Sequence, residues 1–405
     1  MKQIISFELL AYLVFIGFIA IEDPFFVVGY LILLVAVYGL IRKKWPGKLE
    51  QLREACSGRI KEMAVTGLVL SLTLPFVVQG DPYWLQVFDF ALINALMALG
   101  LNFMTGRAGL LCLGYAAFEA IGAYTVGILC LKMGFSFWIA FFLGGILSFI
   151  FGLVLGLPAL RVRGNYLALV TIAFGLVVQE ILLNWESVTG GTNGLIDIPA
   201  PKLFGYAFDS PVDIGPFTMG FQINFYYMAL IVLALSVYLL YKLSNSFFGL
   251  ILTAMREDEL AARCYGINLT KYKLYAFSIG AVFGGFAGAI YAGMINFIAP
   301  QNFGYSLSIF VISIIILGGL DSIPGVLIAS LFLTIFPEKF RAFADYRVMF
   351  YGFIIVLCLL FMREGLMPWK QRIFTSKERT TEKLPLSSSK NAEMLPQGNV
   401  TVNPR

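Results

Sequence analysis

The sequence contains no histidine, and its charged residues are few. Charged side chains make up 13% of the 405 residues, whereas soluble proteins carry about 25%. The absence of histidine excludes Ser-His-Asp and Cys-His nucleophile pairs, histidine metal clusters and imidazole acid–base chemistry. The five cysteines show no paired spacing, so we expect neither a disulfide framework nor a metal site. We therefore expect no catalytic residue, no metal site and no cofactor in this chain.

What the sequence has instead is long apolar runs, in a composition that is 59% hydrophobic. Between Leu274 and Leu320 there is no charged side chain over 47 residues, and about 20 apolar residues suffice to cross a bilayer. Polar residues near 296–302 divide this run into two crossings. Such runs cover almost the whole chain and are too long for barrel strands. The sequence therefore predicts an all-α, polytopic helical membrane protein with about 10–12 spans.

The expected spans follow the apolar runs. They are 5–21, 25–41, 63–80, 84–104, 110–131, 136–159, 165–184, 221–241, 273–295, 304–320 and 348–363. The run 323–336 is too short to cross upright, so we expect a re-entrant segment or a packed half-helix there.

The distribution of basic residues predicts the orientation. Seven lysines and arginines lie between Arg42 and Lys61, and five lie between Lys242 and Lys273, whereas the loop at 185–220 is mainly acidic. Because basic loops remain cytoplasmic, both termini are expected to be cytoplasmic, provided that 323–336 counts as a crossing. The net charge of +5 is then explained by these loops and not by a nucleic-acid surface. The polar tail from 376 to 405 is predicted to be disordered.

One charged, helix-forming stretch lies between two predicted spans, at 253–267. Asp258, Ala261, Ala262 and Tyr265 recur at steps of three and four residues, which predicts that they share one face of a helix. Gly266 is typical of a helix C-terminus. A rigid surface helix of this kind could receive force from another protein, although an ordinary solvated helix explains the pattern equally well.

Several motifs, in a fixed order, resemble a known family. Ala261 and Ala262 are separated from Gly266 by three residues. This spacing resembles the coupling loop of ABC importer permeases, although Leu260 stands where that loop usually has glutamate. The wider pattern is similar to the LivM-type permeases of branched-chain amino-acid ABC importers. It comprises NFMTGRAGL from Asn102, LGYAAF from Leu113, GLPALRVRG from Gly156, TGGTNG from Thr189 and LGGL from Leu317.

The resemblance implies a core permease domain at 85–366, with the bundle of an ABC importer permease, preceded by extra spans at 1–84 and followed by a tail at 367–405. It further implies a bacterial inner-membrane location, a homologous second permease subunit, and an extracytoplasmic substrate-binding protein. Two cytoplasmic ATPases would bind ATP and magnesium and dock on a coupling helix at 254–266. The residues implied in ATPase coupling are Arg256, Glu257, Asp258, Glu259, Ala261, Ala262 and Gly266. Those implied in docking the binding protein are Gly190, Gly191, Asn193 and Gly194, which are turn formers first.

Two positions depart from the family pattern. Tyr115 stands where the family usually has histidine, and Glu119 where it usually has an apolar or small residue. An ionisable group inside a span costs on the order of 3 kcal/mol, so Glu119 is either functional or a carboxyl kept protonated or hydrogen-bonded. With Asn102 and Gln179, these residues form the candidate substrate path. Interhelical hydrogen bonding is the favoured role of Asn102, and contact with interfacial water suits Gln179 equally well.

The resemblance favours inward transport of leucine, isoleucine or valine. The departures leave urea, short amides and other amino acids as alternatives. A stand-alone transporter with Glu119 as its proton site is a second possibility. An intramembrane enzyme is a third, and the missing histidine argues against it.

Overall fold

The computed structural model describes residues 12, 16–17, 60–78, 81–159, 165–203, 205–214, 217–339, 352, 356 and 365–366, with the backbone alone at 60–65, 159, 165, 212–214 and 217–219. The helices are α4 (Ile60–Val77), α5 (Pro82–Asn102), η1 (Phe103–Arg107), α6 (Ala116–Met133), α7 (Phe137–Ala159), α8 (Asn165–Asn184), α9 (Glu186–Thr189), η2 (Gly191–Asn193), α10 (Gln222–Ser244), α11 (Phe247–Glu257), α12 (Glu259–Cys264), α13 (Leu269–Ile295), η3 (Pro300–Phe303), α14 (Tyr305–Gly318) and α15 (Ile323–Lys339). The strands are β1 (Leu195–Ile196), β2 (Lys202–Leu203), β3 (Tyr206–Ala207), β4 (Val212–Ile214), β5 (Phe217–Met219) and β6 (Phe297–Ile298).

Helix α13 is the centre of the bundle, and it packs most extensively against α7, α6 and α5. Its glycines face these neighbours: a Cβ on Gly280 would meet Met104 and Gly100, and one on Gly284 would meet Tyr115 and Phe118. These glycines therefore let α13 pack closely on its neighbours within this chain. In lipid, the burial of apolar side chains does not by itself drive helices to associate, so close backbone packing stabilises the bundle.

The helix ends follow local sequence signals. The Asp81 side chain accepts a hydrogen bond from the Tyr83 N–H at 3.0 Å, and Pro82 occupies the first position of α5, where its missing N–H costs nothing. At the start of α13, the Asn268 side chain accepts from the Lys271 N–H at 3.2 Å. Helix α13 ends at Asn296, whose φ of 59° is left-handed.

The all-helical membrane fold is confirmed for the described residues. Seven of their helices are long and apolar enough to cross a membrane, and their bounds follow the predicted spans closely, with one exception. The span predicted at 110–131 is wrong at its start, because α6 begins only at Ala116. The spans predicted at 5–21, 25–41 and 348–363, and the tail at 367–405, lie almost wholly outside the described residues.

The segment predicted at 323–336 as a re-entrant segment or a packed half-helix is helix α15. It extends to Lys339 and lies antiparallel to α5. The backbone N–H of Asp321, just before α15, bonds Asn102 at one end of α5. At the other end of both helices, the Tyr83 hydroxyl donates to Glu338 at 2.7 Å. Helix α15 therefore accompanies α5 over nearly its full length.

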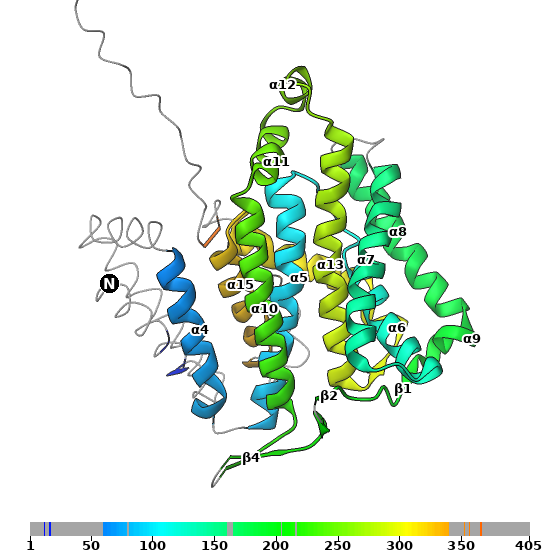
Figure 1. The fold of residues 1–405 in the computed structure, drawn as a ribbon, viewed down its shortest axis with the longest axis vertical. Coiled ribbons are helices and arrows are strands. Elements are labelled where there is room, and N and C mark those ends of the chain that lie inside the picture. The colour runs from blue at the N-terminus through cyan, green and yellow to red at the C-terminus, as the bar shows by residue number, and fades with distance from the viewer. Residues whose placement is uncertain are drawn as a thin grey trace, which may run out of the picture. The chain divides into compact units, whose positions relative to one another are not determined.

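The two ends of the bundle differ in structure. Helices α11 and α12 project at one end, and the β-strands lie at the opposite end (Figure 1). The strands form antiparallel pairs β1–β6, β2–β3 and β4–β5. Pair β1–β6 joins the long loop at 185–220 to the segment that follows α13. These short pairs are the only strands among the described residues, so they decorate a helical bundle and form no barrel.

Candidate functional site

The stretch predicted as one coupling helix at 254–266 forms two helices that meet at a corner. Asp258 has extended backbone angles (φ −150°, ψ 106°) and separates α11 from α12. Its side chain accepts hydrogen bonds from the N–H groups of Leu260 at 2.8 Å and Ala261 at 3.0 Å. The prediction of a single helix is therefore wrong, because an aspartate that caps a new helix ends the preceding one. We call residues 247–267 the α11–α12 corner.

The far end of α12 closes on glycine, as the sequence predicts. Gly266 has a φ of 78°, and its N–H donates to the carbonyl of Arg263 at 2.9 Å. The Ile267 N–H donates to the carbonyl of Ala262 at 3.2 Å. This pair of bonds is the Schellman arrangement, in which a left-handed glycine satisfies the last carbonyls of a helix.

A small apolar core holds the corner together. Ile251, Met255, Ala262 and Leu269 are buried there, so α11, α12 and the start of α13 share one cluster. The Lys273 ammonium also pairs with the carboxylate of Glu259. These contacts hold α11, α12 and the start of α13 together, so the corner can move as one rigid unit.

The opposite side of the corner is exposed and partly apolar. Leu260 is 73% and Tyr265 87% exposed, and Ala261 is exposed as well. The predicted common face of Asp258, Ala261, Ala262 and Tyr265 is wrong in one member, since Ala262 is buried. An exposed leucine and tyrosine on a rigid, charged helix suit a protein contact.

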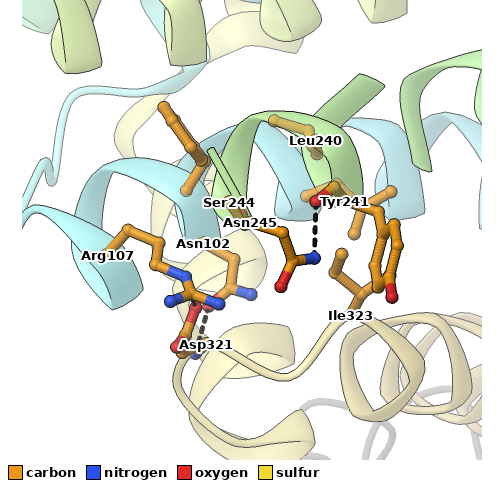
Figure 2. A pocket seen from close by; sticks show the side chains of 10 residues that line it. Asn102, Arg107, Leu240, Tyr241, Ser244, Asn245, Asp321 and Ile323 are labelled. Atoms are coloured by element: carbon orange, nitrogen blue, oxygen red, sulfur yellow. Dashed lines mark hydrogen bonds and ion pairs between the residues drawn. The ribbon is translucent and has the colours of Figure 1, made fainter. Parts of the chain in front are cut away.

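The candidate path residues do not converge on one site. Asn102 lies at the α11–α12 end, where its Oδ1 accepts from the Asp321 N–H at 2.9 Å. It borders a small pocket that Arg107 and Tyr241 also line (Figure 2). Gln179 lines a different pocket, formed by α6, α8 and the start of α14, together with Ser308. These two residues therefore belong to separate regions.

Tyr115 and Glu119 lie deep in the bundle. The Tyr115 hydroxyl donates to the Gly280 carbonyl at 2.7 Å and is fully buried, which is a structural contact. Glu119 is 3% exposed, and its Oε2 has no hydrogen-bond partner among the described residues. A buried carboxyl oxygen without a partner costs free energy, so Glu119 remains a functional candidate.

Both residues lie where α6 begins inside the bundle. The chain leaves η1 at one end, where a Cβ on Gly109 would lie 3.3 Å from Arg256. It then runs inward through residues 108–115, and the Leu113 N–H bonds the Thr171 hydroxyl at 2.9 Å. Helix α6 starts beside Gly284, midway along α13. Its first turn therefore presents backbone N–H groups at membrane depth, which is tolerated only inside protein.

The predicted docking residues form a tight turn. Gly190, Gly191 and Gly194 have φ values of 78°, 60° and 69°, and a Cβ on Gly194 would lie 2.0 Å from the Ile298 carbonyl. Asn193 alone among the four is exposed. These glycines shape the loop that carries β1, and their docking role stays a prediction.

Sequence reasoning missed three charged residues. Asp89 is fully buried in α5, and neither of its carboxylate oxygens has a partner among the described residues. Arg107 and Asp321 form an ion pair at 2.5 Å. Asp89 could have been found as the lone charge in the apolar run 82–106. The partnership of Arg107 and Asp321 spans more than 200 residues of sequence, and no local signal indicates it.

Within the described ranges, no group of three acidic, cysteine or histidine side chains could hold a metal ion.

Comparison with known proteins adds the family. The family model described as "Branched-chain amino acid transport system / permease component" matches residues 83–361. The permease protein LivM of the high-affinity branched-chain amino acid transport system is 37% identical in Salmonella typhimurium, over 74% of this chain and 73% of that protein. Its Escherichia coli K12 counterpart is also 37% identical, over 76% and 75%. The permease protein LivH of the same system in E. coli K12 is 25% identical, over 67% and 90%.

No solved structure matches the chain. The family match covers α5 to α15, that is, every crossing helix named above, and it leaves α4 outside. The chain is thus a multi-pass membrane protein, and it belongs to the family of branched-chain amino acid transport permease components.

Proposed function

We propose that this chain is the translocating subunit of an ABC importer that carries branched-chain amino acids inward, and that its α11–α12 corner is the surface on which a partner ATPase acts. The corner carries the proposal. Its helix α12 is capped at both ends, and the corner packs on an apolar core that it shares with the start of α13. A displacement imposed on Leu260 or Tyr265 would therefore reach the central helix of the bundle.

This proposal fixes the orientation. The α11–α12 end would be cytoplasmic and the end with the β-strands extracytoplasmic, as the basic loops predict. Both chain termini would then be cytoplasmic, in a bacterial inner membrane. A substrate-binding protein would dock at the strand end, near the turn that holds Asn193. ATP and magnesium would be bound by the partner ATPases and not by this chain.

The exposed face of α8 supports a second permease subunit beside this one. Leu169, Leu176, Val177 and Ile181 are exposed along it, and the pocket lined by Gln179 and Ser308 borders the same helix. Gln179 is partly exposed there, and lipid tails offer its amide no hydrogen bond. A homologous permease would cover this face and make the pocket part of a path between the two subunits, with apolar walls suited to leucine, isoleucine or valine.

The coupling role is tested by placing a charge on the exposed side of the corner. In the assembled transporter, Ala261→Arg should abolish co-purification of the ATPase while the chain still inserts into the membrane. A bulky residue at Gly266 should do the same, because left-handed backbone disfavours it. The matched control is Leu203→Arg, a similarly exposed apolar position at the opposite end. Normal ATPase recovery with Ala261→Arg would refute the assignment.

Substrate identity is tested by uptake of labelled leucine into vesicles that hold the whole complex. Unlabelled valine and isoleucine should compete strongly, and alanine and urea weakly. Strong competition by urea with none by valine would instead favour the amide alternative.

The buried, unpartnered carboxyl of Glu119 favours a second candidate, a transporter that works alone and is driven by protons. Proteoliposomes with this chain alone separate the two. Uptake driven by a proton gradient without ATP would support the second candidate, and uptake only with the partner ATPases supports the importer.

A further inference from the structure

The turn between α14 and α15 holds a residue in an unfavourable backbone conformation. Asp321 has a φ of 69°, in the left-handed region that costs most L-residues roughly 1–2 kcal/mol. Aspartate tolerates this region better than most side chains, but glycine would occupy it freely. Such a residue persists when its surroundings hold it there, and its side chain then has a reason to be present.

Asp321 is held from two directions by the end of α5. Its backbone N–H donates to Asn102 Oδ1 at 2.9 Å, and its carboxylate pairs with Arg107 Nε at 2.5 Å. Figure 2 shows the three side chains together at the edge of the pocket. The turn before α15 is thus tied to the last residue of α5 and to η1.

The same segment is tied to α11. Arg107 Nη1 donates to the hydroxyl of Thr253 at 3.4 Å, and Arg256 Nη1 donates to the carbonyl of Gly106. Thr253 and Arg256 lie in the last two turns of α11, directly before the corner at Asp258. We call Asn102, Gly106, Arg107, Thr253, Arg256 and Asp321 the junction.

The junction is not an exposed surface contact. The side chains of Arg107 and Asp321 are 13% and 15% exposed. Burial raises the pKa of Asp321 above its ordinary value, and the nearby Arg107 and Arg256 offset only part of that rise. An exposed ion pair adds little to rigidity, but removing one partner of a buried pair leaves an uncompensated charge. The junction therefore links α11, η1 and the α14–α15 turn firmly.

We propose that Arg107 and Asp321 are positioning residues for transport, which pass the displacement of α11 to the α14–α15 turn and so to α15 and α5. This inference rests on the proposed coupling function. Helix α13 gives the corner one route into the bundle, and the junction gives it a second route on the other side of α11. Because α15 packs along α5, a shift at Asp321 would tilt both helices together.

The test compares uptake with ATP hydrolysis in the complete transporter. Asp321→Asn keeps a side chain that tolerates left-handed backbone and removes the charge; Arg107→Gln removes the other partner. Each should leave ATPase recovery unchanged and lower the substrate taken up per ATP hydrolysed by about tenfold, within the usual range of coupling between sites. The double variant should be no worse than either single variant, because both remove the same link.

Two further variants keep the test decisive. Asp321→Gly removes the carboxylate, and glycine occupies the left-handed backbone freely, so it should uncouple transport while the turn keeps its conformation. Tyr83→Phe is the matched control, since it removes a bond between α5 and α15 at their other ends; its uptake per ATP should match the wild type. Uncoupling with Asp321→Gly would support the inference even if Asp321→Asn fails to fold.

Unchanged uptake per ATP in Asp321→Gly, or an equal loss in Tyr83→Phe, would overturn the inference. Failure of the proposed function looks different, because the wild-type complex itself would then show no ATP-dependent uptake. A wild type that is coupled, with Arg107 and Asp321 variants coupled equally well, would refute the junction alone.

Discussion

The packing of α6 on α13 gives a sharp stability prediction at Gly288. A Cβ added there would lie 1.9 Å from the Glu119 carbonyl oxygen and 2.9 Å from the Ala123 nitrogen. Ordinary contact begins at 3.4 Å, so Gly288→Ala forces the two helices apart by about 1.5 Å. Both obstructing atoms are backbone, so no side-chain rotation can relieve the clash.

The size of the effect follows from what that separation disrupts. A radial gap of about 0.5–1 Å already removes a quarter to a half of each dispersion contact, and overpacking a core typically costs about 1–3 kcal/mol. Because α13 also packs on α5 and α7, the loss extends beyond one pair of helices. At roughly 2–4 °C per kcal/mol, the melting temperature of the purified protein should fall by about 2–12 °C.

The matched control is Gly67→Ala, in α4, where an added Cβ meets nothing within 4 Å. Alanine is better than glycine inside a helix by roughly 0.5–1 kcal/mol, so this variant should be neutral or slightly stabilised. Thermal unfolding of both variants in the same detergent is the assay. Equal melting temperatures for Gly288→Ala and Gly67→Ala would refute the close approach of α6 and α13.

Three further predictions concern single local contacts. Asp258→Ala should raise hydrogen exchange across α12, because losing an N-cap costs about 1 kcal/mol, whereas Asp258→Asn should retain protection; equal exchange in both would contradict the cap. Asn296→Val should lower the melting temperature more than Asn296→Gly, because the φ of Asn296 is 59° and glycine tolerates it. Tyr226→Phe should lower the stability by about 1 kcal/mol, measured by thermal unfolding. The Tyr226 hydroxyl bonds the Ser71 carbonyl at 2.8 Å, and this carbonyl has no helical donor because Pro75 lacks an N–H. Adding Pro75→Ala to this variant should recover the lost stability.

Most crossing helices could be predicted from the sequence because apolar length is a property of the segment itself. The span at 165–184 needed only composition, and it matches α8. Gly266 was equally predictable, since a left-handed helix end strongly favours glycine.

The start of α6 could not be predicted in the same way. Residues 110–115 are as apolar as the helix that follows, so the run looks continuous. Contacts with other helices set the start of α6: the Leu113 N–H bonds the Thr171 hydroxyl, and the Ala116 N–H bonds the Ser308 hydroxyl at 3.0 Å. Partners that lie 58 and 192 residues away leave no trace in local spacing.

The candidate site shows the same division. The charged helix between two spans was visible in the sequence, but the corner at Asp258 was not, because aspartate fits both a helix surface and an N-cap. The junction was missed for the same reason as the start of α6. Asn102 and Asp321 are 219 residues apart, and Arg107 looked like an ordinary basic residue at the end of a span.

Site-specific photocrosslinking is the most direct test of the coupling surface. A photoreactive residue is placed at Leu260 or at Tyr265 in the assembled transporter, and at Tyr206, which is exposed at the opposite end, as the control. We expect Leu260 and Tyr265 to crosslink to the ATPase, with a yield that changes when ATP is added, and Tyr206 to give no ATPase adduct. An ATPase adduct from Tyr206, or none from either position on α12 and its C-terminal turn, would contradict the account.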